Sequence, residues 1–393
     1  MGKYIHELKG WPHFRWSEKL LLQPLAAVTR HQGLLIGHMK GLGFYLQTEA
    51  MLHTLTLDVV KSSEIEGEAL DQQQVRSSIA RRLGIDIGAL TPADRHVEGV
   101  VDMMLDATQN YAKPLTQERL FAWHAALFPT GYSGLRKIRV GMWRDDRDGP
   151  MEVVSGPLGR EHVHYQAPGA RKIARQMGAF LKWLEGDAAI DPVLKAGIAH
   201  LWFVTIHPFE DGNGRIARAI ADMVLARAEN SSQRFYSMSA QIRLERKAYY
   251  DTLEATQKGE LDITAWLEWF LACLDRAFKR AQSVLANVLM KSRFWQAHSH
   301  TGFNVRQRDM LNRLLEGFDG SLTSSKWAKI EKCSQDTAVR DINELVELGV
   351  LKKNAAGGRS TSYSLTPASA WPGAPVRNSP TTGVVRARGR TRA

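Results

Sequence analysis

From His207 to Arg218 the sequence reads HPFEDGNGRIAR, and the helices expected on either side of this segment form the core of the predicted fold. An apolar segment, Val193 to Thr205, precedes it, and Asp191-Pro192 is typical of a helix start, because Asp caps a helix and Pro suits its first turn. A second helix should follow, since apolar residues recur there at three- and four-residue spacing: Ile216, Ala219, Ile220, Met223 and Val224. We therefore expect a short loop that joins a buried helix to a second helix on the same core.

This junction collects groups that bind anions. Gly212 and Gly214 flank Asn213, so the loop can adopt positive φ angles and present consecutive backbone N–H groups. Arg215 and Arg218 are three apart near the start of the second helix, where the helix dipole also attracts negative charge. Together these features predict a site for a polyphosphate.

Asp211 and His207 complete the predicted site. A lone carboxylate inside a phosphate site is typical of a cation ligand, since Mg²⁺ prefers one or two carboxylates together with phosphate oxygens. His207, at the edge, can take a proton near neutral pH. Each feature alone is common in ordinary turns and solvated helix faces, but their combination within one junction favours function. The stretch has neither the Gly-Lys-Ser/Thr of a P-loop, nor a dinucleotide-binding Gly-x-Gly-x-x-Gly, nor the alternating carboxylates of an EF-hand.

The stretch resembles the motif of the Fic family. It matches His-Pro-Phe-x-(Asp/Glu)-Gly-Asn-Gly-Arg-x-x-Arg at every defined position, and the resemblance extends over residues 107–289 or so. Fic proteins are all-helical with a small β-hairpin flap, and most transfer AMP from Mg²⁺-bound ATP to a Ser, Thr or Tyr hydroxyl of a protein. The resemblance therefore implies ATP and Mg²⁺ as cofactors.

The resemblance also implies a role for each residue of the motif. His207 would be the general base that deprotonates the target hydroxyl, and Asp211 would hold Mg²⁺. The other residues would hold the triphosphate: Gly212, Asn213 and Gly214 at the α- and β-phosphates, Arg215 at the β-phosphate and Arg218 at the γ-phosphate. Positioning and charge stabilisation would supply most of the rate.

A flap is expected before the motif. Residues 153–154 and 162–165 read as a short hairpin beside turn signals. Val163, His164 and Tyr165 resemble the flap edge that holds a target peptide by strand addition. Ordinary packing or surface roles for these three residues are the alternative.

An adenine site is expected after the motif. Residues 246–250 resemble the segment that supplies an adenine-contacting tyrosine. We assign that role to Tyr249, with Gln257 one helical stretch later, and packing is again the alternative.

An inhibitory motif lies upstream. Residues 62–67 read SSEIEG and resemble the family pattern (Ser/Thr)-x-x-x-Glu-(Gly/Asn), with Ser62, Glu66 and Gly67 at the defined positions. In that class Glu66 would pair with Arg218 and take the place of the γ-phosphate, so that ATP binds only in an unproductive pose. An ordinary capped turn is the alternative. By family analogy Glu66 would also help to hydrolyse AMP from a modified protein.

Composition and charge bound the remaining possibilities. The chain has 393 residues, of which 44% are hydrophobic and 24% charged, which predicts two or three globular domains. No apolar run is long enough to span a membrane, and no signal peptide is evident. Only Cys273 and Cys333 are present, so a disulfide framework is excluded and a cytoplasmic location is expected. The net charge of +11 includes a basic C-terminal stretch.

Helices are also expected outside the motif. Ser17 to Arg30 reads as a first helix, with Ser17 as its cap and Pro24 as a kink or break, and an apolar-periodic stretch from Leu34 to Val60 reads as the next. Asp262 begins a further helical run to Leu289.

The segment after about residue 300 resembles a winged helix-turn-helix. An amphipathic stretch from Ser334 to Leu351 is followed by a glycine turn at Gly357-Gly358 and a strand-like run over 360–365. In a DNA-binding interpretation the contacts would come from Gln335, Thr337, Arg340, Asn343, Lys352, Lys353 and Arg359. Four acidic residues on the same helix would repel DNA, so a role in dimerisation or target presentation is favoured and DNA binding is the alternative.

The expected architecture is mainly α. An N-terminal helical region with the inhibitory motif (1–105) precedes a Fic-type helical bundle with a β-hairpin flap (106–295), a winged-helix domain (300–366) and a disordered basic tail (367–393). The expected function is a self-inhibited protein adenylyltransferase that releases pyrophosphate. Its partners would be a protein with a hydroxyl side chain, the chain itself as a target, and a second copy in a homodimer.

Three alternatives to this function stay open. The first is a winged-helix DNA-binding regulator whose Fic domain senses nucleotide. The second is a Fic enzyme that acts mainly in removing AMP. The third is a relative that uses another nucleotide or moves the γ-phosphate. The sequence identifies neither the target protein nor the modified residue.

Overall fold

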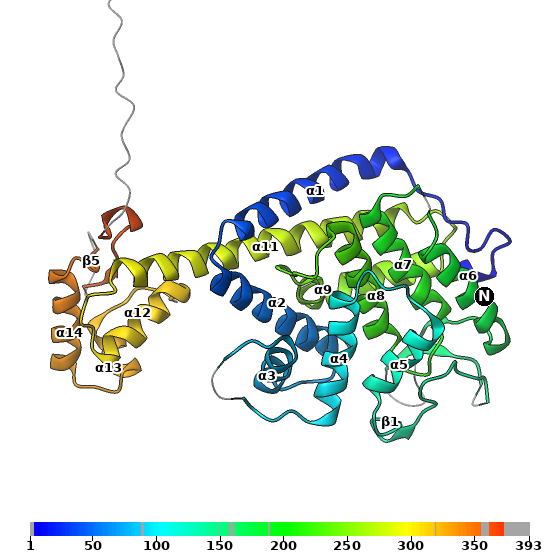
Figure 1. Ribbon diagram of the computed structural model, residues 1–393, viewed down its shortest axis with the longest axis horizontal. Coiled ribbons are helices and arrows are strands. Elements are labelled where there is room, and N and C mark those ends of the chain that lie inside the picture. The colour runs from blue at the N-terminus through cyan, green and yellow to red at the C-terminus, as the bar shows by residue number, and fades with distance from the viewer. Residues whose placement is uncertain are drawn as a thin grey trace, which may run out of the picture. The chain divides into compact units, whose positions relative to one another are not determined.

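The computed structural model describes residues 4–87, 90–147, 149–156, 160, 162–187, 189–318, 320–354 and 361–372. These residues form two compact units that divide between Gln282 and Ser283 (Figure 1). The expected mainly helical fold class is confirmed, since helices dominate the described residues and the strands among them pair in short two-stranded hairpins. Within the described ranges, no helix combines the length and the apolar character that crossing a bilayer requires.

The first unit is built from helices around a central pair. Its helices are α1 (Glu18–Lys40), α2 (Phe44–Ile65), α3 (Gln72–Leu83), α4 (Arg95–Gln109), α5 (Gln117–Leu127), α6 (Ile173–Leu184), α7 (Pro192–Ile206), α8 (Asn213–Glu229), α9 (Met238–Leu244) and α10 (Arg246–Gln257). A further helix, α11 (Thr264–Ala297), runs through the division between the two units. Short 3-10 turns cover Ile5–Glu7 and Ala170–Lys172.

The first helix neither breaks at Pro24 nor ends at Arg30, so the alternative of a break is wrong. Ser17 caps α1 as predicted, but the helix continues through Pro24 and position 30 to Lys40, and the chain turns only at residues 41–43. The reason is a continuous buried stripe, formed by Leu21, Val28, Leu35 and Met39. Burial of this stripe outweighs the loss of a backbone N–H at Pro24 and the flexibility of Gly33 and Gly37 within the helix.

The core of the first unit is the α7–α8 pair (Figure 1). Asp191 caps α7 by accepting hydrogen bonds from the backbone N–H groups of Val193 and Leu194, as expected. From Val193 to Ile206 only one residue of α7, Lys195, is not buried. Because α7 is apolar on nearly every face, it is surrounded by protein, and its C-terminal end delivers the motif loop to a fixed place.

Two hairpins lie beside the motif loop. Strands β1 (Tyr132–Ser133) and β2 (Arg136–Lys137) form the first, and β3 (Glu152–Ser155) pairs antiparallel with β4 (His162–Gln166) in the second. The expected flap hairpin is therefore confirmed. Its register pairs Val153 with Tyr165 and Ser155 with His162, with an irregularity after Val153.

The second unit contains three further helices and a hairpin. The elements are α12 (Val305–Gly317), α13 (Ser324–Ile330), α14 (Gln335–Glu347), β5 (Leu351–Lys353) and β6 (Tyr363–Leu365). Trp327, Ile342 and Leu345 belong to its buried apolar cluster. The capped helix over 335–347 matches the expectation, and the winged-helix assignment remains a prediction. Residues 355–360, with the expected turn at Gly357-Gly358 and with Arg359, lie outside the described residues.

The expected disorder does not begin at residue 367. Residues Ala368–Ala370 form a 3-10 turn, and Trp371 is buried against Phe294 at a ring-centroid distance of 5.2 Å. The Trp371 indole N–H also donates to the Thr366 carbonyl oxygen at 3.1 Å. Burial of this large aromatic side chain holds the segment in place. The remainder of the predicted tail, 373–393, lies outside the described residues.

Candidate active site

His207 occupies the residue directly after α7. It ends the helix in a left-handed conformation with φ of 52°, and its N–H donates to the Phe203 carbonyl oxygen at 3.0 Å. The ring nitrogen Nδ1 lies 3.2 Å from the Val204 carbonyl oxygen. Because a carbonyl only accepts, Nδ1 carries the proton and Nε2 keeps its lone pair. Burial lowers the pKa of His207 to about 4, so the imidazole is neutral at pH 7 and Nε2 can accept a proton.

The loop after His207 is fixed by Asn213. Its side-chain oxygen accepts from the Phe209 N–H at 3.0 Å, and its amide donates to the Phe209 carbonyl oxygen at 2.8 Å. Gly212 has φ of 78°, as the sequence predicts, but Gly214 lies inside α8 with a helical conformation. The glycines therefore differ in purpose. Gly212 supplies a positive φ, whereas Gly214 supplies space.

The space at Gly214 is taken up by Glu66. A Cβ at position 214 would lie 2.2 Å from Glu66 Oε1, so only glycine lets this carboxylate approach the first turn of α8. Glu66 follows the last residue of α2, and Gly67 then turns the chain with φ of 88°. The N–H groups at the start of a helix have no partners within the helix and attract negative charge.

Arg218 forms the ion pair that the sequence predicts. Its Nη2 lies 2.8 Å from Glu66 Oε1, and the same nitrogen donates to the Ser62 carbonyl oxygen at 2.8 Å. Its Nε donates to Ser62 Oγ at 2.9 Å. The Arg218 side chain is only 2% exposed, so this buried cation depends on Glu66 and Ser62 for its partners.

Arg215 has a different acidic partner. Its Nη1 lies 2.5 Å from Glu68 Oε2, and its guanidinium stacks over the Phe128 ring at 5.1 Å. The Arg215 Nε is buried and has no hydrogen-bond partner among the described residues. Both motif arginines are therefore buried cations whose partners are carboxylates from the segment that follows α2.

Asp211 points toward the first hairpin. One carboxylate oxygen accepts from the Gly212 N–H at 2.6 Å, and the other accepts from the Ser133 hydroxyl. A half-buried carboxylate at the edge of an anion site suits Mg²⁺ when phosphate oxygens complete the coordination. Asp211 and Arg215 are thus the residues that could hold a metal and its phosphate together.

A cavity of about 710 Å³ lies beside His207 and Gly214. It is lined by Glu66 and His207, by α10 and by the flap, and the expected adenine residues Tyr249 and Gln257 also line it. The Tyr249 hydroxyl lies 2.9 Å from His200 Nε2, and burial raises the pKa of this tyrosine well above its ordinary value. The Tyr249 hydroxyl therefore stays protonated, and the side chain that lines the cavity is uncharged.

The three flap residues differ in their surroundings. Tyr165 is buried and its hydroxyl donates to the Thr205 carbonyl oxygen at 2.7 Å, so its side chain belongs to the core. His164 lies on the cavity side and contacts Glu254 of α10, and Val163 is half-buried. Strand addition would use the backbone of the flap, and it remains a prediction.

Sequence reasoning missed several residues of the site. Arg144 is buried and its Nε donates to the His207 carbonyl oxygen at 2.8 Å, while the Arg144 N–H donates to the Pro208 carbonyl oxygen at 2.9 Å. The Tyr250 hydroxyl lies 3.4 Å from Glu66 Oε2. Tyr250 follows the predicted adenine residue Tyr249, and Glu68 lies two residues after Glu66. Their nearness in sequence to predicted site residues could have identified both. No pattern in the sequence identifies Arg144.

Comparisons with known proteins find matches in two parts of the chain. Residues 114–225 match the Fic/DOC family, and residues 4–85 match a domain of unknown function, DUF4172. The chain is 27% identical over 223 residues to a protein adenylyltransferase Fic of Aedes aegypti, covering 56% of this chain and 40% of the relative. It is 32% identical over 129 residues to the protein of the same name from Drosophila melanogaster, covering 32% and 25%.

The two adenylyltransferase matches each cover less than half of the relative. The chain spans two fifths or less of the length of those two relatives. A Fic family protein from Desulfovibrio desulfuricans G20 is similar in fold, with 21% identity, a TM-score of 0.50, and coverage of 89% of this chain and 97% of that one. Residues 114–225 are therefore a Fic/DOC family domain, in a chain that has Fic protein adenylyltransferases among its homologues.

Proposed function

We propose that the chain is a self-inhibited protein adenylyltransferase. It would transfer AMP from ATP to a Ser, Thr or Tyr hydroxyl of a target protein, or of the chain itself, and release pyrophosphate. One observation carries the proposal: the neutral imidazole of His207 lines the same cavity as Gly214 in the first turn of α8, and the start of this helix carries two buried arginines, Arg215 and Arg218. The homologues named protein adenylyltransferase agree with this chemistry.

The reaction would use groups that are already in position. His207 Nε2 takes the proton of the target hydroxyl, and the oxygen forms a bond to the α-phosphorus of ATP. The bond between that phosphorus and the bridging oxygen of pyrophosphate breaks at the same centre. The first N–H groups of α8, with Arg215 and Arg218, stabilise the phosphate charges, and Asp211 would hold the Mg²⁺ that helps to neutralise them. The contribution of His207 as base is about 10²–10⁴-fold.

Self-inhibition would follow from the Glu66–Arg218 pair. By the family resemblance Arg218 would bind the γ-phosphate, and Glu66 is its negative partner at 2.8 Å. A γ-phosphate that binds Arg218 must displace this carboxylate. Because one partner of a buried pair is costly to remove, ATP in its productive pose is disfavoured until Glu66 moves. Tyr250 and the Ile65 carbonyl oxygen, which accepts from Arg246 Nε at 2.7 Å, help to hold the end of α2.

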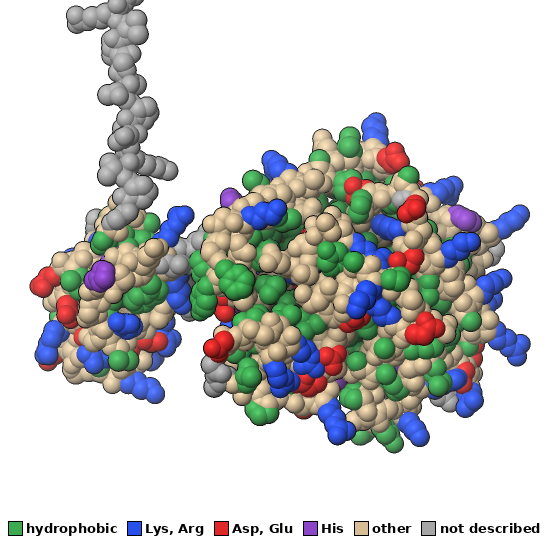
Figure 2. All heavy atoms as spheres, viewed as in Figure 1, with side chains coloured by type: hydrophobic (Ala, Val, Ile, Leu, Met, Phe, Trp, Pro, Cys, Tyr) green, Lys and Arg blue, Asp and Glu red, His purple; other side chains and the backbone are tan. Residues whose placement is uncertain are grey.

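The second unit would present targets or a second copy of the chain. Arg340 is exposed on α14, but acidic side chains accompany it, and on the face shown in Figure 2 acidic and basic side chains are interspersed over this unit. A protein-contacting winged helix fits this mixture better than a DNA-binding one.

The experiment that tests the transfer uses the Glu66→Gly chain with Mg²⁺ and ATP labelled at the α-phosphate. Label should appear on protein, and adding His207→Ala should lower its rate of incorporation by about 10²–10⁴-fold. His300→Asn, which removes an exposed histidine of the second unit, is the matched control and should change nothing.

A parallel reaction with ATP labelled at the γ-phosphate separates AMP transfer from phosphate transfer. We expect no protein-bound label there. Label from the γ-phosphate alone, or equal rates with and without His207, would contradict the proposed reaction.

A further inference from the structure

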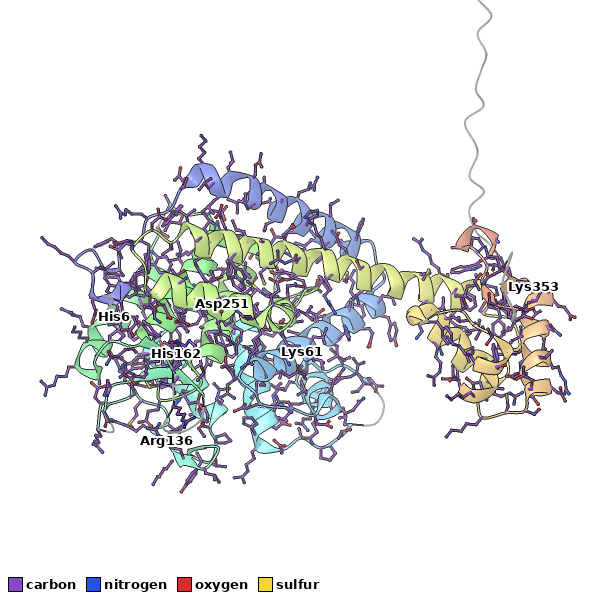
Figure 3. The ribbon with its side chains drawn as sticks, turned by 180° about the vertical axis from the view of Figure 1, so that it is seen from behind. His6, Lys61, Arg136, His162, Asp251 and Lys353 are labelled. Atoms are coloured by element: carbon purple, nitrogen blue, oxygen red, sulfur yellow. The ribbon has the colours of Figure 1, made fainter. Side chains whose placement is uncertain are left out.

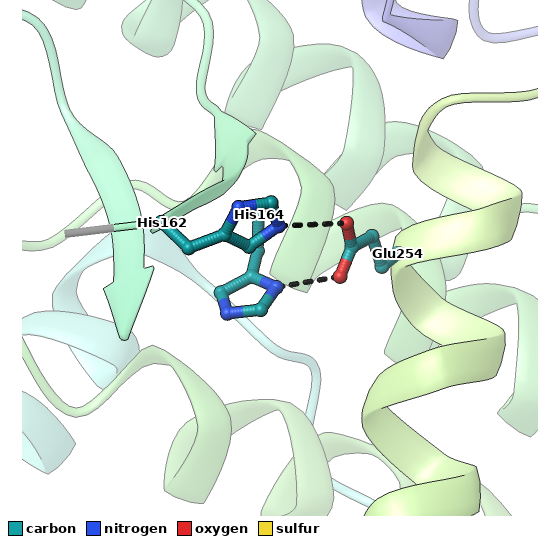
Figure 4. A group of neighbouring side chains, drawn as sticks. All are labelled: His162, His164 and Glu254. Atoms are coloured by element: carbon teal, nitrogen blue, oxygen red, sulfur yellow. Dashed lines mark hydrogen bonds and ion pairs between the residues drawn. The ribbon is translucent and has the colours of Figure 1, made fainter. Parts of the chain in front are cut away.

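A cluster outside the motif joins the flap to α10. His162 and His164 are two residues apart in β4, so both project from the same face of the strand, toward Glu254 of α10 (Figure 4). His164 Nδ1 lies 2.6 Å from Glu254 Oε2, and His162 Nε2 lies 3.9 Å from Glu254 Oε1. Figure 3 labels His162 in the flap and Asp251 in α10, the two elements that meet here.

The three ligand atoms form a compact set. One nitrogen from each histidine and one carboxylate oxygen all lie within 4.8 Å of one another. The centroids of the two imidazole rings are 4.6 Å apart, and the rings are nearly perpendicular, at an interplanar angle of 83°. Side-chain rotation alone can bring such a set around a single ion.

Ser155 provides the support that metal-binding histidines usually have. Its hydroxyl lies 2.6 Å from His164 Nε2, the nitrogen that faces away from Glu254. A metal-bound histidine holds its second nitrogen in such a contact, which fixes the tautomer and the ring orientation. Without a metal, the Nδ1–H of His164 donates to Glu254 Oε2 and the Ser155 hydroxyl can donate to Nε2. When Nδ1 binds an ion the proton belongs on Nε2, where Ser155 Oγ can accept it.

We propose that His162, His164 and Glu254 bind Zn²⁺ and thereby fasten the flap to α10. Two imidazoles and one carboxylate are a donor set that Zn²⁺ accepts, with water in a fourth position. Mg²⁺ prefers oxygen ligands, so this site differs in chemistry from the one expected at Asp211. The His162 side chain is 67% exposed, which gives the ion a path from solvent.

Lys258 is the competitor for this site. Its ammonium lies 2.5 Å from Glu254 Oε1, one helical turn away, and its side chain is 39% exposed. It can therefore turn into solvent when a metal takes the carboxylate. This competition makes a directional prediction, because removal of the Lys258 charge should strengthen metal binding rather than weaken it.

The consequence concerns access to the cavity. Val154, Ser155 and His164 line it from the flap, and Glu254 lines it from α10. An ion shared by these elements would restrict the opening of the flap. The effect on a protein target rests on the proposed function, whereas metal binding and flap protection do not.

The test is a Zn²⁺ titration of the untagged full chain by calorimetry. We expect one equivalent to bind, and His162→Asn to weaken it by roughly 100-fold, since even loss of a supporting contact costs about 10–100-fold in affinity. Ser155→Ala should weaken it by about 10-fold. Lys258→Gln should strengthen it, and His300→Asn, the matched control, should leave it unchanged.

Hydrogen exchange gives a readout that is independent of catalysis. One equivalent of Zn²⁺ should slow exchange of the β3 and β4 amides in the wild type but not in His162→Asn. Equal Zn²⁺ affinity in the wild type and His162→Asn would overturn the proposed site. Binding that leaves flap exchange unaltered would overturn the fastening of the flap. Because His162 is exposed, circular dichroism should show the variant to be folded.

Discussion

The helices α8 and α14 both begin after a short loop and both carry arginines in their first half, but these arginines are buried in α8 and exposed in α14. At α8, Arg215 and Arg218 are 1% and 2% exposed, and their partners are carboxylates from the segment after α2. At α14, Ser334 caps the helix and Arg340 is exposed. The buried charge there, Asp341, accepts from Arg306 Nε at 2.7 Å and so joins α12 to α14.

This difference distinguishes a buried ion pair that only joins two helices from one that lies beside a cavity. Burial of a cation is costly, so a chain keeps one where it is paired. At α14 the pair links two helices of the same small unit, which is a sufficient reason for it. At α8, Glu66 of the Glu66–Arg218 pair lines a cavity that the neutral imidazole of His207 also lines, and under the proposed function a phosphate would replace the carboxylate. Buried charge beside a cavity is therefore the informative feature.

The largest effect on stability is expected when the α8 pair is broken. Arg218→Ala should lower the free energy of unfolding by about 2–3 kcal/mol, somewhat less than usual for a buried pair, because the Glu66 side chain left behind is 30% exposed. Arg340→Ala on α14 should change it by no more than about 0.5 kcal/mol. Urea denaturation of both variants measures this contrast, and equal effects would mean that burial does not distinguish the two helices.

A pH effect of similar size should come from His200, a buried histidine of α7. Burial lowers the pKa of His200 from 6.5 to about 3. Between pH 6.5 and about pH 3, His200 is therefore protonated in the unfolded chain but neutral in the folded chain. The free energy of unfolding is unaffected above pH 6.5 and decreases as the pH falls below it. The loss should reach about 2 kcal/mol between pH 7.5 and pH 5.

Urea denaturation at the two pH values, for the wild type and for His200→Gln, measures that contribution. The variant should show a shallower fall. An unchanged pH dependence would mean that His200 is not buried in its neutral form.

A smaller effect on stability is expected from Gly214→Ala at the start of α8. Gly→Ala in a helix usually stabilises it by about 0.5–1 kcal/mol. At Gly214 we expect the opposite, because the added Cβ meets Glu66 Oε1. In the Glu66→Gly background the ordinary gain should return. Thermal unfolding of the two single variants and the double variant tests this, and additive effects would separate Gly214 from Glu66.

The smallest effect is expected at α14 with nucleic acid. Filter retention of a random DNA duplex across a salt series should be the same for the wild type and Arg340→Ala. If Arg340 contacts a phosphate, the variant should instead reduce the slope of the salt dependence by about one. That result would restore the DNA-binding interpretation of the second unit.

The sequence predicts the parts of this molecule that are local or that complete a contiguous motif. The helix caps at Ser17 and Asp191 and the flap hairpin follow from short local patterns, and the Glu66–Arg218 pair follows from the family resemblance of the two motifs. The course of α1 past Pro24 did not, because tertiary burial of its apolar stripe overrides the local signal.

Contacts between distant segments were also beyond the sequence. Arg144 holds the carbonyl oxygen of His207 across 63 positions, and Glu254 meets His164 across 90. No periodicity or motif relates such residues, since their proximity is created by the packing of the helices. The role of Gly214 belongs to the same class, because the space that it leaves becomes meaningful only once Glu66 is in place.

The proposed self-inhibition requires Glu66 to occupy the place of a phosphate at Arg218. Initial rates of AMP incorporation from α-labelled ATP, compared between the wild type and Glu66→Gly at equal protein concentration, test it most directly. A pair worth about 1–3 kcal/mol predicts that the variant is faster by roughly 5–150-fold. Equal rates, or a slower variant that is still folded, would contradict the account.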